Sequence, residues 1–297
     1  LKATILAPLE GPAIAESWFI FFDGEQRTTF ANKQTVPLSA ASFSGDGARV
    51  EVGDAHFTLS PAGAARGSIS GREGTARFDL TWTRDESPIG QPLSLLPLRF
   101  FRTGPFPRSK LNTPFPSLRF SGTLALPSGP QVVDGWPGMQ GHNWGREHTF
   151  EYAWGQCLFP ADDVMVEGFS ARVKLAGRVL PRLSGLVVRR GARSYRFDTL
   201  LDGWRQRAEV SPERWQVALR STDGEATLEL DAAGRPMACL GYDNPDGARS
   251  YCFNSKLAKA TLTVRPADGA SFTCHSEHGA ALELLRREAD PRFPHVV

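Results

Sequence analysis

The sequence predicts an all-β protein built from many short antiparallel strands. Apolar and polar residues alternate in several segments, among them ARVEVGDAHFTLS (48–60), TARFDLTWT (75–83) and RWQVALRSTDGEATLELD (214–231). This alternation is the pattern of a strand with one buried face. Asp-Gly and Gly-Asp pairs interrupt it and indicate hairpins. With 29 glycines, 22 prolines and no sustained amphipathic helix pattern, the chain favours a sandwich or barrel.

The same pattern continues through SLRFSGTLAL (117–126) and SYCFNSKLAKATLTV (250–264), which we expect to be strands. The last periodic stretch, AALELLRREA (280–289), fits either a short helix or a closing strand. Because both halves carry alternating hairpins, two similar β domains are the simplest division of this length. We place them at residues 1–150 and 151–297.

Composition excludes several classes of protein. The chain of 297 residues is 41% hydrophobic and 22% charged, with a net charge of +2, as in ordinary folded domains. It has no Lys/Arg block, so we expect no nucleic-acid partner. It has no apolar run of about 18 residues, which excludes a membrane-spanning helix. The chain starts at Leu1 rather than Met and shows no signal segment, so we expect a cytoplasmic or membrane-peripheral location; nothing indicates an oligomeric state.

The four cysteines form no CxxC pair, which argues against a structural zinc site. Cys239 and Cys252 are thirteen residues apart and could face each other across a hairpin. Free, buried thiols are the favoured interpretation for all four cysteines.

Residues 87–116 differ from the rest because they combine seven prolines with many apolar side chains. Proline is excluded from central strands, so a long apolar loop must bury itself or cover something. One interpretation is a belt packed across a barrel wall or between domains. The other is a lid over an apolar pocket, or a loop that makes peripheral contact with a membrane.

The stretch GMQGHNWGREHTFEYAWGQ (138–156) concentrates two histidines, two tryptophans, a tyrosine, a phenylalanine and two glutamates. Within it, an extended backbone over 148–158 would place the aromatic residues on one face and small or acidic residues on the other. Upstream, residues 134–145 hold five glycines or prolines. There we expect a tight loop rather than a regular strand.

This stretch supplies the candidate site residues. Histidine exchanges protons near neutral pH, tryptophan offers an apolar wall and a π face that tolerates a cation, and a carboxylate can orient an imidazole or act as an acid. Such a set could protonate an alkene and shelter the resulting carbocation. The candidate catalytic residues are His142, His148, Asp134 and Glu147. The candidate ligand-binding residues are Asn143, Trp144, Tyr152, Trp154 and Trp136.

Two other interpretations concern the same residues. Buried His, Asn and Trp side chains often satisfy one another's hydrogen bonds and plug the end of a barrel. His142 and His148 supply only two local metal ligands, and His275 and His278 have opposite strand parity, so we expect no metal site. The sequence also has no GxSxG, HExxH or Gly-rich phosphate loop, and we expect no cofactor.

GMQGHNWGREH (138–148), followed by WGQ (154–156), resembles a signature of a superfamily. This superfamily joins carotenoid 1,2-hydratases (hydroxyneurosporene synthases), tocopherol cyclases and AttH-type proteins, with fungal pericyclases of the Diels–Alderase type as more distant relatives. ESWFIFFDGE (16–25) is similar to the early W-x-x-x-F strand of the family. SKLNTPFPSLRFSG (109–122) is similar to its K-x-n-P-x-P segment. The resemblance covers most of residues 16–160.

The resemblance implies two tandem lipocalin-like (calycin) barrels and a pocket for an apolar, often isoprenoid or polyketide, ligand. It also implies acid-initiated hydration or cyclisation of a double bond without a cofactor. The residues that stand in the matching stretch are His142, Asn143, Trp144, His148 and Trp154. Glu147 is a weaker candidate from the same comparison, and Asp134 is a candidate through proximity alone.

Our main hypothesis is therefore an enzyme that binds a hydrophobic, isoprenoid-like molecule and adds a proton at a C=C bond. Its alternative is a non-catalytic lipid or pigment carrier, or a stress-related protein, in which the HNWG segment is an interface plug. An enzyme of this kind requires a titratable group with a shifted pKa at an apolar wall. A carrier requires an apolar cavity without such a group.

Overall fold

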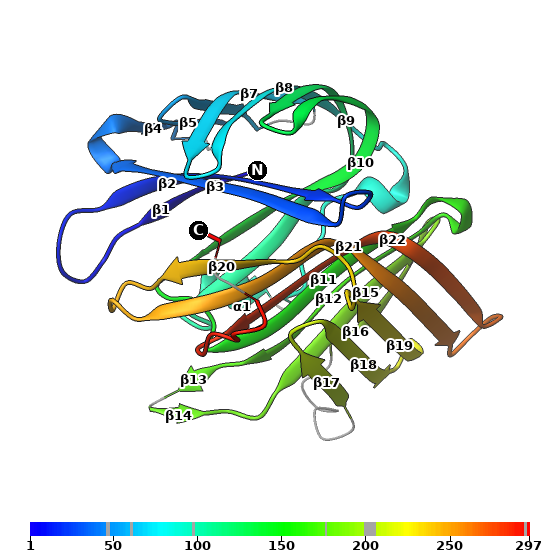
Figure 1. Cartoon of the computed structure of the whole chain (residues 1–297). Helices are drawn as coiled ribbons and strands as arrows, with labels where there is room; N and C mark the ends of the chain where they lie inside the picture. Colours follow the sequence, from blue (N-terminus) through cyan, green and yellow to red (C-terminus); the bar gives the residue numbers. More distant parts are fainter. Residues whose placement is uncertain (46–47, 60–61, 97–98, 176, 199–205, 294–295) are drawn as a thin grey trace.

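The computed structural model of the chain describes residues 1–45, 48–59, 62–96, 99–175, 177–198, 206–293 and 296–297. Nearly all regular structure in these residues consists of antiparallel strands, which confirms the all-β prediction. Figure 1 shows two layers, the upper one built from β1–β10 and the lower one from β11–β22. None of the helices in the described ranges has the length and apolar character needed to span a membrane.

The upper layer contains two antiparallel sheets. The three-stranded sheet has the order β1 (Lys2–Leu6), β2 (Ile14–Asp23), β3 (Thr28–Pro37). The seven-stranded sheet runs from β10 to β4 and contains β4 (Ala41–Phe43), β5 (Arg49–Val52), β6 (Ala55–Thr58), β7 (Ala62–Gly71), β8 (Gly74–Arg84), β9 (Ser109–Leu126) and β10 (Gly129–Gly145). Short helices in this half are η1 (Leu38–Ala40), η2 (Pro88–Gly90) and α1 (Arg99–Thr103).

The lower layer is a ten-stranded sheet with the order β16-β15-β12-β11-β22-β21-β19-β18-β17, and β20 pairs with β21 beside this path. Its strands are β11 (Glu151–Phe159), β12 (Val164–Arg172), β15 (Leu183–Arg190), β16 (Arg193–Phe197), β17 (Arg207–Ser211), β18 (Arg214–Ser221), β19 (Gly224–Asp231), β20 (Ala238–Asp243), β21 (Arg249–Pro266) and β22 (Phe272–Arg286). The remaining elements are η3 (Pro160–Asp162) and the small hairpin of β13 (Lys174–Leu175) and β14 (Arg178–Val179).

The large sheets are strongly curved but have free edges. Over the described residues, the seven-stranded path ends at β4 and β10, and the ten-stranded path ends at β16 and β17. The ten-stranded sheet curls until β15 and β16 approach β18, while β2 and β3 pack against β5 and β7. Strand β10 belongs to the seven-stranded sheet and β11 to the ten-stranded sheet, so the chain passes from one sheet to the other close to residue 150. The division at residue 150 stays a prediction.

The curled ten-stranded sheet encloses a packed apolar core. Trp215 is fully buried at its centre, and its indole Nε1–H donates to Ser170 Oγ (2.9 Å). Two glycines make room for the ring. A Cβ at Gly155 or Gly168 would lie 2.2 or 2.1 Å from a leucine methyl group and 3.3 or 3.2 Å from the Trp215 ring. The packing around Trp215 is thus close enough that a single added methyl group at either glycine cannot be accommodated without a shift.

The upper layer has a core of its own, in which the ring of Phe78 stacks against Phe19 and Phe57 with centroids 6.0 and 6.4 Å apart. Strand β2 contributes to two cores because successive side chains point to opposite faces. Phe19 belongs to the upper core. Its neighbour Trp18 packs between the layers against Leu240 and Leu285 of the lower sheet.

Residues 134–145 are not the loop that their glycines predicted. They lie in β10 and pair with β9, with register shifts between Val133 and Trp136 and on both sides of Gln140. The prediction was wrong because two of these glycines, Gly138 and Gly145, serve close packing inside a strand pair. A Cβ at Gly138 would lie 2.5 Å from the Phe120 ring.

Two open alternatives are resolved. Residues 280–286 belong to β22, so the closing-strand interpretation of that stretch is confirmed. All four cysteines are free and buried. The β20–β21 hairpin pairs Cys239 with Phe253 and Leu240 with Cys252, so the two cysteines lie on opposite faces and cannot be bridged.

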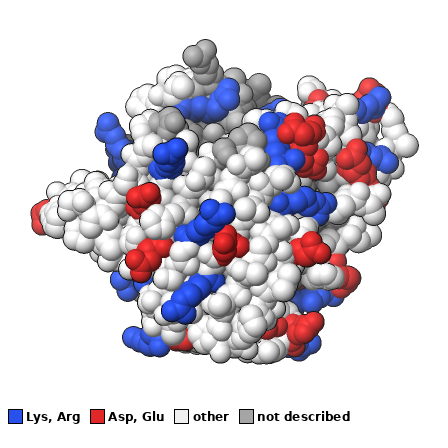
Figure 2. All heavy atoms as spheres, turned by 90° about the horizontal axis from the view of Figure 1, so that it is seen from above, with Lys and Arg blue, Asp and Glu red and all other residues white. Residues whose placement is uncertain are grey.

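Figure 2 shows basic and acidic side chains interspersed over the face that is seen from above. This distribution matches the near-neutral net charge of +2. On this face the structure offers no broad area of one sign, as a nucleic-acid surface would require.

We expect the Gly168→Ala variant to be destabilised by about 1–3 kcal/mol, because the added methyl group collides with Leu186 and approaches the Trp215 ring. Urea unfolding followed by tryptophan fluorescence measures the loss. Gly45→Ala is the matched control, since a Cβ there meets nothing within 4 Å. Equal stability of the Gly168 and Gly45 variants would contradict this account of the core.

Candidate functional site

The HNWG segment lies at the end of an edge strand and is largely open to solvent. His142 pairs with Asn112 and Trp144 with Lys110, and the two aromatic rings stack with centroids 5.1 Å apart. Trp144 keeps 37% of its surface exposed. Partial burial against its surroundings lowers the pKa of His142, so this imidazole is neutral around pH 7.

The other candidates from this strand are also exposed. The side chains of Asp134, Trp136 and Asn143 on β10 are exposed to solvent. Glu147 forms an ion pair with Arg108 (3.6 Å) in which both side chains are solvent-accessible, a type of contact that contributes little. The structure therefore does not gather these side chains around one enclosed centre.

His148 belongs to a second group, between the layers. The Asn244 amide nitrogen donates to Ala248 O (2.8 Å) and Ser250 Oγ (3.0 Å), which turns its oxygen toward His148 Nδ1 (3.0 Å). Nδ1 therefore carries the hydrogen and Nε2 is the basic nitrogen. Burial, followed by the charge of Lys2, lowers the pKa of His148.

The face of Tyr242 continues this group, because the His148 ring stacks on it at 5.3 Å and Lys2 Nζ lies 4.0 Å from the same ring. Tyr152 is a neighbour in the same apolar cluster. Burial raises the pKa of both tyrosine hydroxyls well above the usual value. His148 has a hydrogen-bond partner in Asn244 and a stacking partner in Tyr242, and both lie between the two layers. This arrangement agrees with the plug interpretation for His148.

Trp154 stands apart from that group because its indole Nε1–H donates to the carboxylate oxygen Oε1 of Glu167 (3.0 Å). The hydroxyl of Thr113 donates to the same oxygen (2.7 Å). Glu167 is 0% exposed, and its second oxygen, Oε2, is buried without a hydrogen-bond partner in the described part of the chain. A side chain from β9 of the upper layer thus meets a carboxyl of the lower sheet.

Burial raises the pKa of Glu167 to about 7. The hydrogen bonds from Thr113 and Trp154 and the charge of Arg189 oppose this rise without cancelling it. The carboxyl group is therefore about half protonated near neutral pH. Because Oε1 accepts two hydrogen bonds, the proton belongs on Oε2.

The surroundings of Glu167 are apolar. Met165 and Phe169 flank it on the same face of β12, and Val187 is its partner on β15. All three belong to one apolar cluster, which also contains Ile89, Leu93, Leu95, Leu111, Trp154 and Leu158. We call this set the Glu167 cluster. It supplies the apolar wall beside a titratable group that an enzyme of the expected kind requires.

The sequence analysis included Trp154 but missed Glu167. The sequence did contain a signal for Glu167. VMVEG (164–168) is an apolar run, buried throughout in the structure, that contains a single acid. An unbroken run is typical of a strand covered on both faces, where an acid cannot reach water. The search instead followed the local density of aromatic and histidine residues.

The proline-rich segment 87–116 supplies the cover. Ile89, Leu93 and Leu95 are buried against the outer face of the lower sheet, which agrees with the belt interpretation. Phe100 is 59% exposed. Residues 97–98 lie outside the described residues.

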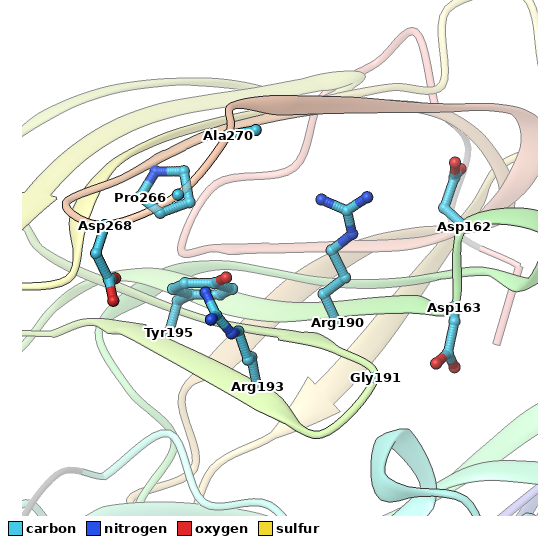
Figure 3. A pocket seen from close by; sticks show the side chains of 10 residues that line it. Asp162, Asp163, Arg190, Gly191, Arg193, Tyr195, Pro266, Asp268 and Ala270 are labelled. Atoms are coloured by element: carbon cyan, nitrogen blue, oxygen red, sulfur yellow. The ribbon is translucent and has the colours of Figure 1, made fainter.

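The structure has a cavity of about 460 Å³ at the rim of the lower sheet. Figure 3 shows Arg190 projecting between Asp162 and Asp163 on one side and Tyr195 and Arg193 on the other. Its charged lining differs from the apolar pocket that the sequence predicted. A second cleft of about 240 Å³ opens between the layers and is lined in part by Ile89 and Leu158 of the Glu167 cluster.

Metal-binding clusters of three or more His, Cys, Asp or Glu side chains do not occur among the described residues.

Comparisons with known proteins support the fold. No family model matches the chain. The chain is 23% identical over 253 residues to the uncharacterized protein Rv0493c of Mycobacterium tuberculosis strain H37Rv, and equally to protein MT0513 of strain CDC 1551; the match covers 85% of this chain and 72% of each relative.

Two solved structures are similar over nearly the whole chain. A candidate AttH (NE1406) from Nitrosomonas europaea has a TM-score of 0.59 at 16% identity, covering 95% of this chain and 84% of that one. Kievitone hydratase from Nectria haematococca has a TM-score of 0.54 at 10% identity, covering 96% and 87%. The chain thus shares the fold of these two proteins.

The raised pKa of Glu167 predicts a particular pH dependence of stability. In the unfolded chain the carboxyl has its ordinary pKa of 4.5, and in the folded chain about 7. The folded state therefore holds an extra proton between these values, and the free energy of unfolding falls as pH rises through this window, by up to about 3 kcal/mol. Glu167→Gln stays neutral and should lose this dependence.

Urea unfolding near pH 5 and near pH 8 measures the effect. The wild type should lose stability relative to Glu167→Gln at the higher pH. Glu209→Gln, an exposed position on β17, should follow the wild type. Parallel curves for the wild type and the Glu167 variant would show that Glu167 titrates normally.

Proposed function

We propose that this protein is a cofactor-free enzyme that adds water to, or cyclises, a hydrophobic isoprenoid-like molecule at a C=C bond, with Glu167 as the proton donor. The observation that carries the proposal is the buried carboxyl group with a pKa of about 7 and an unpartnered oxygen in an apolar cluster. A group of this kind can donate a proton near neutral pH and is costly to keep for stability alone.

The proton would leave from Oε2. As it bonds to one alkene carbon, the π electrons form the new C–H bond, the other carbon becomes cationic and Glu167 becomes a carboxylate. Water then attacks the cation and returns a proton to Glu167, so the net reaction is hydration and the acid is regenerated. If a second double bond of the substrate attacks instead, a ring forms and loss of a proton to Glu167 completes cyclisation.

Two features of the chain favour such a cation. The indole of Trp154 is held by its hydrogen bond to Glu167, so its ring lies beside the position where charge would develop. An indole face stabilises positive charge. The ammonium group of Lys256 lies 5.5 Å from the centroid of this ring, and its own charge is balanced by an ion pair with Glu283 (2.7 Å). The apolar neighbours of Glu167 would exclude stray water, which otherwise quenches the cation.

The similarity to kievitone hydratase supports hydration over other acid-initiated reactions, as an analogy of fold. Asn143 and Trp144 remain proposed ligand contacts, and we propose the same role for His142 in place of the catalytic one. They pair with residues 110–112 of β9, next to Thr113. Their strand therefore borders the Glu167 cluster, while Asp134, Trp136 and Glu147 lie farther out along the exposed edge or on the linker. We also propose that partners are limited to an apolar small molecule.

The alternative, a non-catalytic carrier, does not require an acid at position 167. A carrier gains nothing from an isolated acid inside its binding surface, and a glutamine at position 167 would keep the acceptor that Thr113 and Trp154 use. The unpartnered Oε2 of Glu167 therefore favours the enzyme.

We expect Glu167→Gln to lower turnover by about 100-fold or more, because the amide cannot donate a proton of the required acidity. The wild-type rate should fall as pH rises through about 7, since the acid must be protonated. Incubation with a panel of prenylated and polyene substrates in water enriched in the heavy oxygen isotope, followed by mass spectrometry, detects hydration.

Glu209→Gln is the control for this assay and should keep wild-type turnover. Substrates that cyclise gain no oxygen and are recognised by chromatography. Full turnover of the Glu167 variant on a substrate that the wild type converts would refute the assignment of the acid.

A further inference from the structure

Glu167 is completely covered in this structure, so a substrate can reach it only if part of the cover moves. Two kinds of chain segment lie over it. One is the first part of β9, whose Thr113 donates to the carboxyl and which is paired with β10 along its length. The other is the proline-rich segment 87–95, which we call the cover.

Among the described residues, the cover has few backbone hydrogen bonds to the strands around it. It forms a single isolated bridge, in which Leu93 and Thr113 exchange backbone hydrogen bonds of 2.9 and 2.8 Å. The apolar side chains of Ile89, Leu93 and Leu95 complete its contact with the lower sheet. A segment with so few backbone bonds to a sheet opens more readily than a paired strand.

Arginines hold the rest of the cover through its carbonyl groups. The guanidinium of Arg189, on β15, donates to Pro92 O (2.8 Å), Pro88 O (3.5 Å) and Gln91 O. Arg196, on β16, donates to Ser94 O (3.1 Å). Because prolines lack a backbone N–H, this segment cannot form a regular ladder, and its carbonyls suit a side-chain donor; Pro88 O also accepts from the Gln91 N–H (3.3 Å). A single guanidinium thus gathers three carbonyls into one point of attachment.

The cleft of about 240 Å³ lies at the start of the cover. Its mouth is polar, and its apolar part is formed by Ile89, Leu158 and Pro160; the remaining lining residues are Asp85, Ser87, Ser117, Arg119 and Asp163. Ser87 Oγ is buried there without a hydrogen-bond partner in the described part of the chain. Ile89 and Leu158 also belong to the Glu167 cluster, so the cleft and the surroundings of the acid share these two apolar side chains. Movement of Ile89 with the cover would join the two.

We propose that residues 87–95 are a hinged cover over Glu167, that Arg189 is the positioning residue that latches it, and that a hydrophobic substrate enters through the cleft between Ile89 and Leu158. This inference rests on the proposed function of Glu167. The substrate class follows from the surfaces that opening would uncover, since Met165, Val187 and Leu93 offer only apolar contacts.

The position of Arg189 ties the latch to the acid. Its positive charge acts on Glu167 and lowers the pKa of that carboxyl, while burial and Arg196 lower the pKa of Arg189 itself. If the cover opened, the Arg189 guanidinium would lose its three carbonyl partners while its charge still acted on the Glu167 carboxyl. The neighbouring Arg190 points to the other cavity and lies over the Phe272 ring (4.4 Å), so it provides a matched control on the same strand.

A thiol placed at position 167 tests the cover directly. In the Glu167→Cys variant, the rate of modification by N-ethylmaleimide, mapped by peptide mass spectrometry, measures how often the cover opens. Adding Arg189→Gln should raise this rate about tenfold or more, because charge-assisted bonds to three carbonyls are lost. Adding Arg190→Gln should leave it unchanged, and adding Arg189→Lys should give an intermediate rate.

The buried thiol of Cys157, on β11, faces the inner core of the lower sheet, whereas Glu167 faces the covered side. Its modification rate therefore reports general unfolding in the same sample. An unchanged rate at position 167 with Arg189→Gln would overturn the latch. Equal acceleration at position 167 and at Cys157 would also overturn it, because Arg189 would then only stabilise the fold.

A second measurement covers the case in which the thiol variant does not fold. Hydrogen exchange of the Leu93 and Thr113 amides in the otherwise unchanged chain should accelerate about tenfold with Arg189→Gln and stay constant with Arg190→Gln. Constant exchange in both variants would reject the cover. Neither measurement depends on turnover, so the cover can fail while Glu167→Gln abolishes activity, and the reverse.

Discussion

The central strands β11, β12 and β15 of the lower sheet are buried on both faces, and the rest of the structure depends on that constraint. One face closes around Trp215, and the glycines of β11 and β12 allow this close approach. The other face must be covered as well, because it carries Met165, Leu285 and similar apolar side chains. The sheet of β1–β3, the first part of β9 and the proline-rich cover together exclude water from it.

Burial on both faces also explains the chemistry of Glu167. In a sheet with one wet face, an acid in β12 would turn to water and keep its ordinary pKa. Here Val166 faces the inner core and Glu167 faces the covered side, so either direction is dry. The hydrogen bonds from Thr113 and Trp154 satisfy one oxygen and leave the other to the apolar cluster. The acid is thus a consequence of how the layers stack.

Thr113 connects the acid and its cover. Its side chain holds Glu167, and its backbone pairs with Leu93 of the cover. Displacement of the cover therefore disturbs a residue that contacts the acid. An enzyme that forms a reactive cation benefits from such a connection, since the geometry around the acid is complete only when water is excluded.

The sequence predicted those parts of the structure that depend on local pattern. Alternation identified the strands, and the proline-rich run identified a covering segment. Trp154 was found because aromatic side chains cluster around it. Glu167 was not, because its significance depends on Thr113, 54 residues away. The HNWG segment was weighted by its local density of reactive residues, whereas exposure is decided by which strand forms the edge of a sheet. The pKa of an acid likewise depends on tertiary burial.

Strand β2 has a consequence for how this protein can change over time. Phe19 supports the upper core and Trp18 supports the contact between the layers, although the two are consecutive in the chain. Substitutions at alternate positions of this strand therefore affect different parts of the structure, either the upper core or the contact between the layers. Variation on the Trp18 side can reshape the space between the layers while the upper core keeps its packing. A change of shape between the layers is thus compatible with an unchanged arrangement of the upper core.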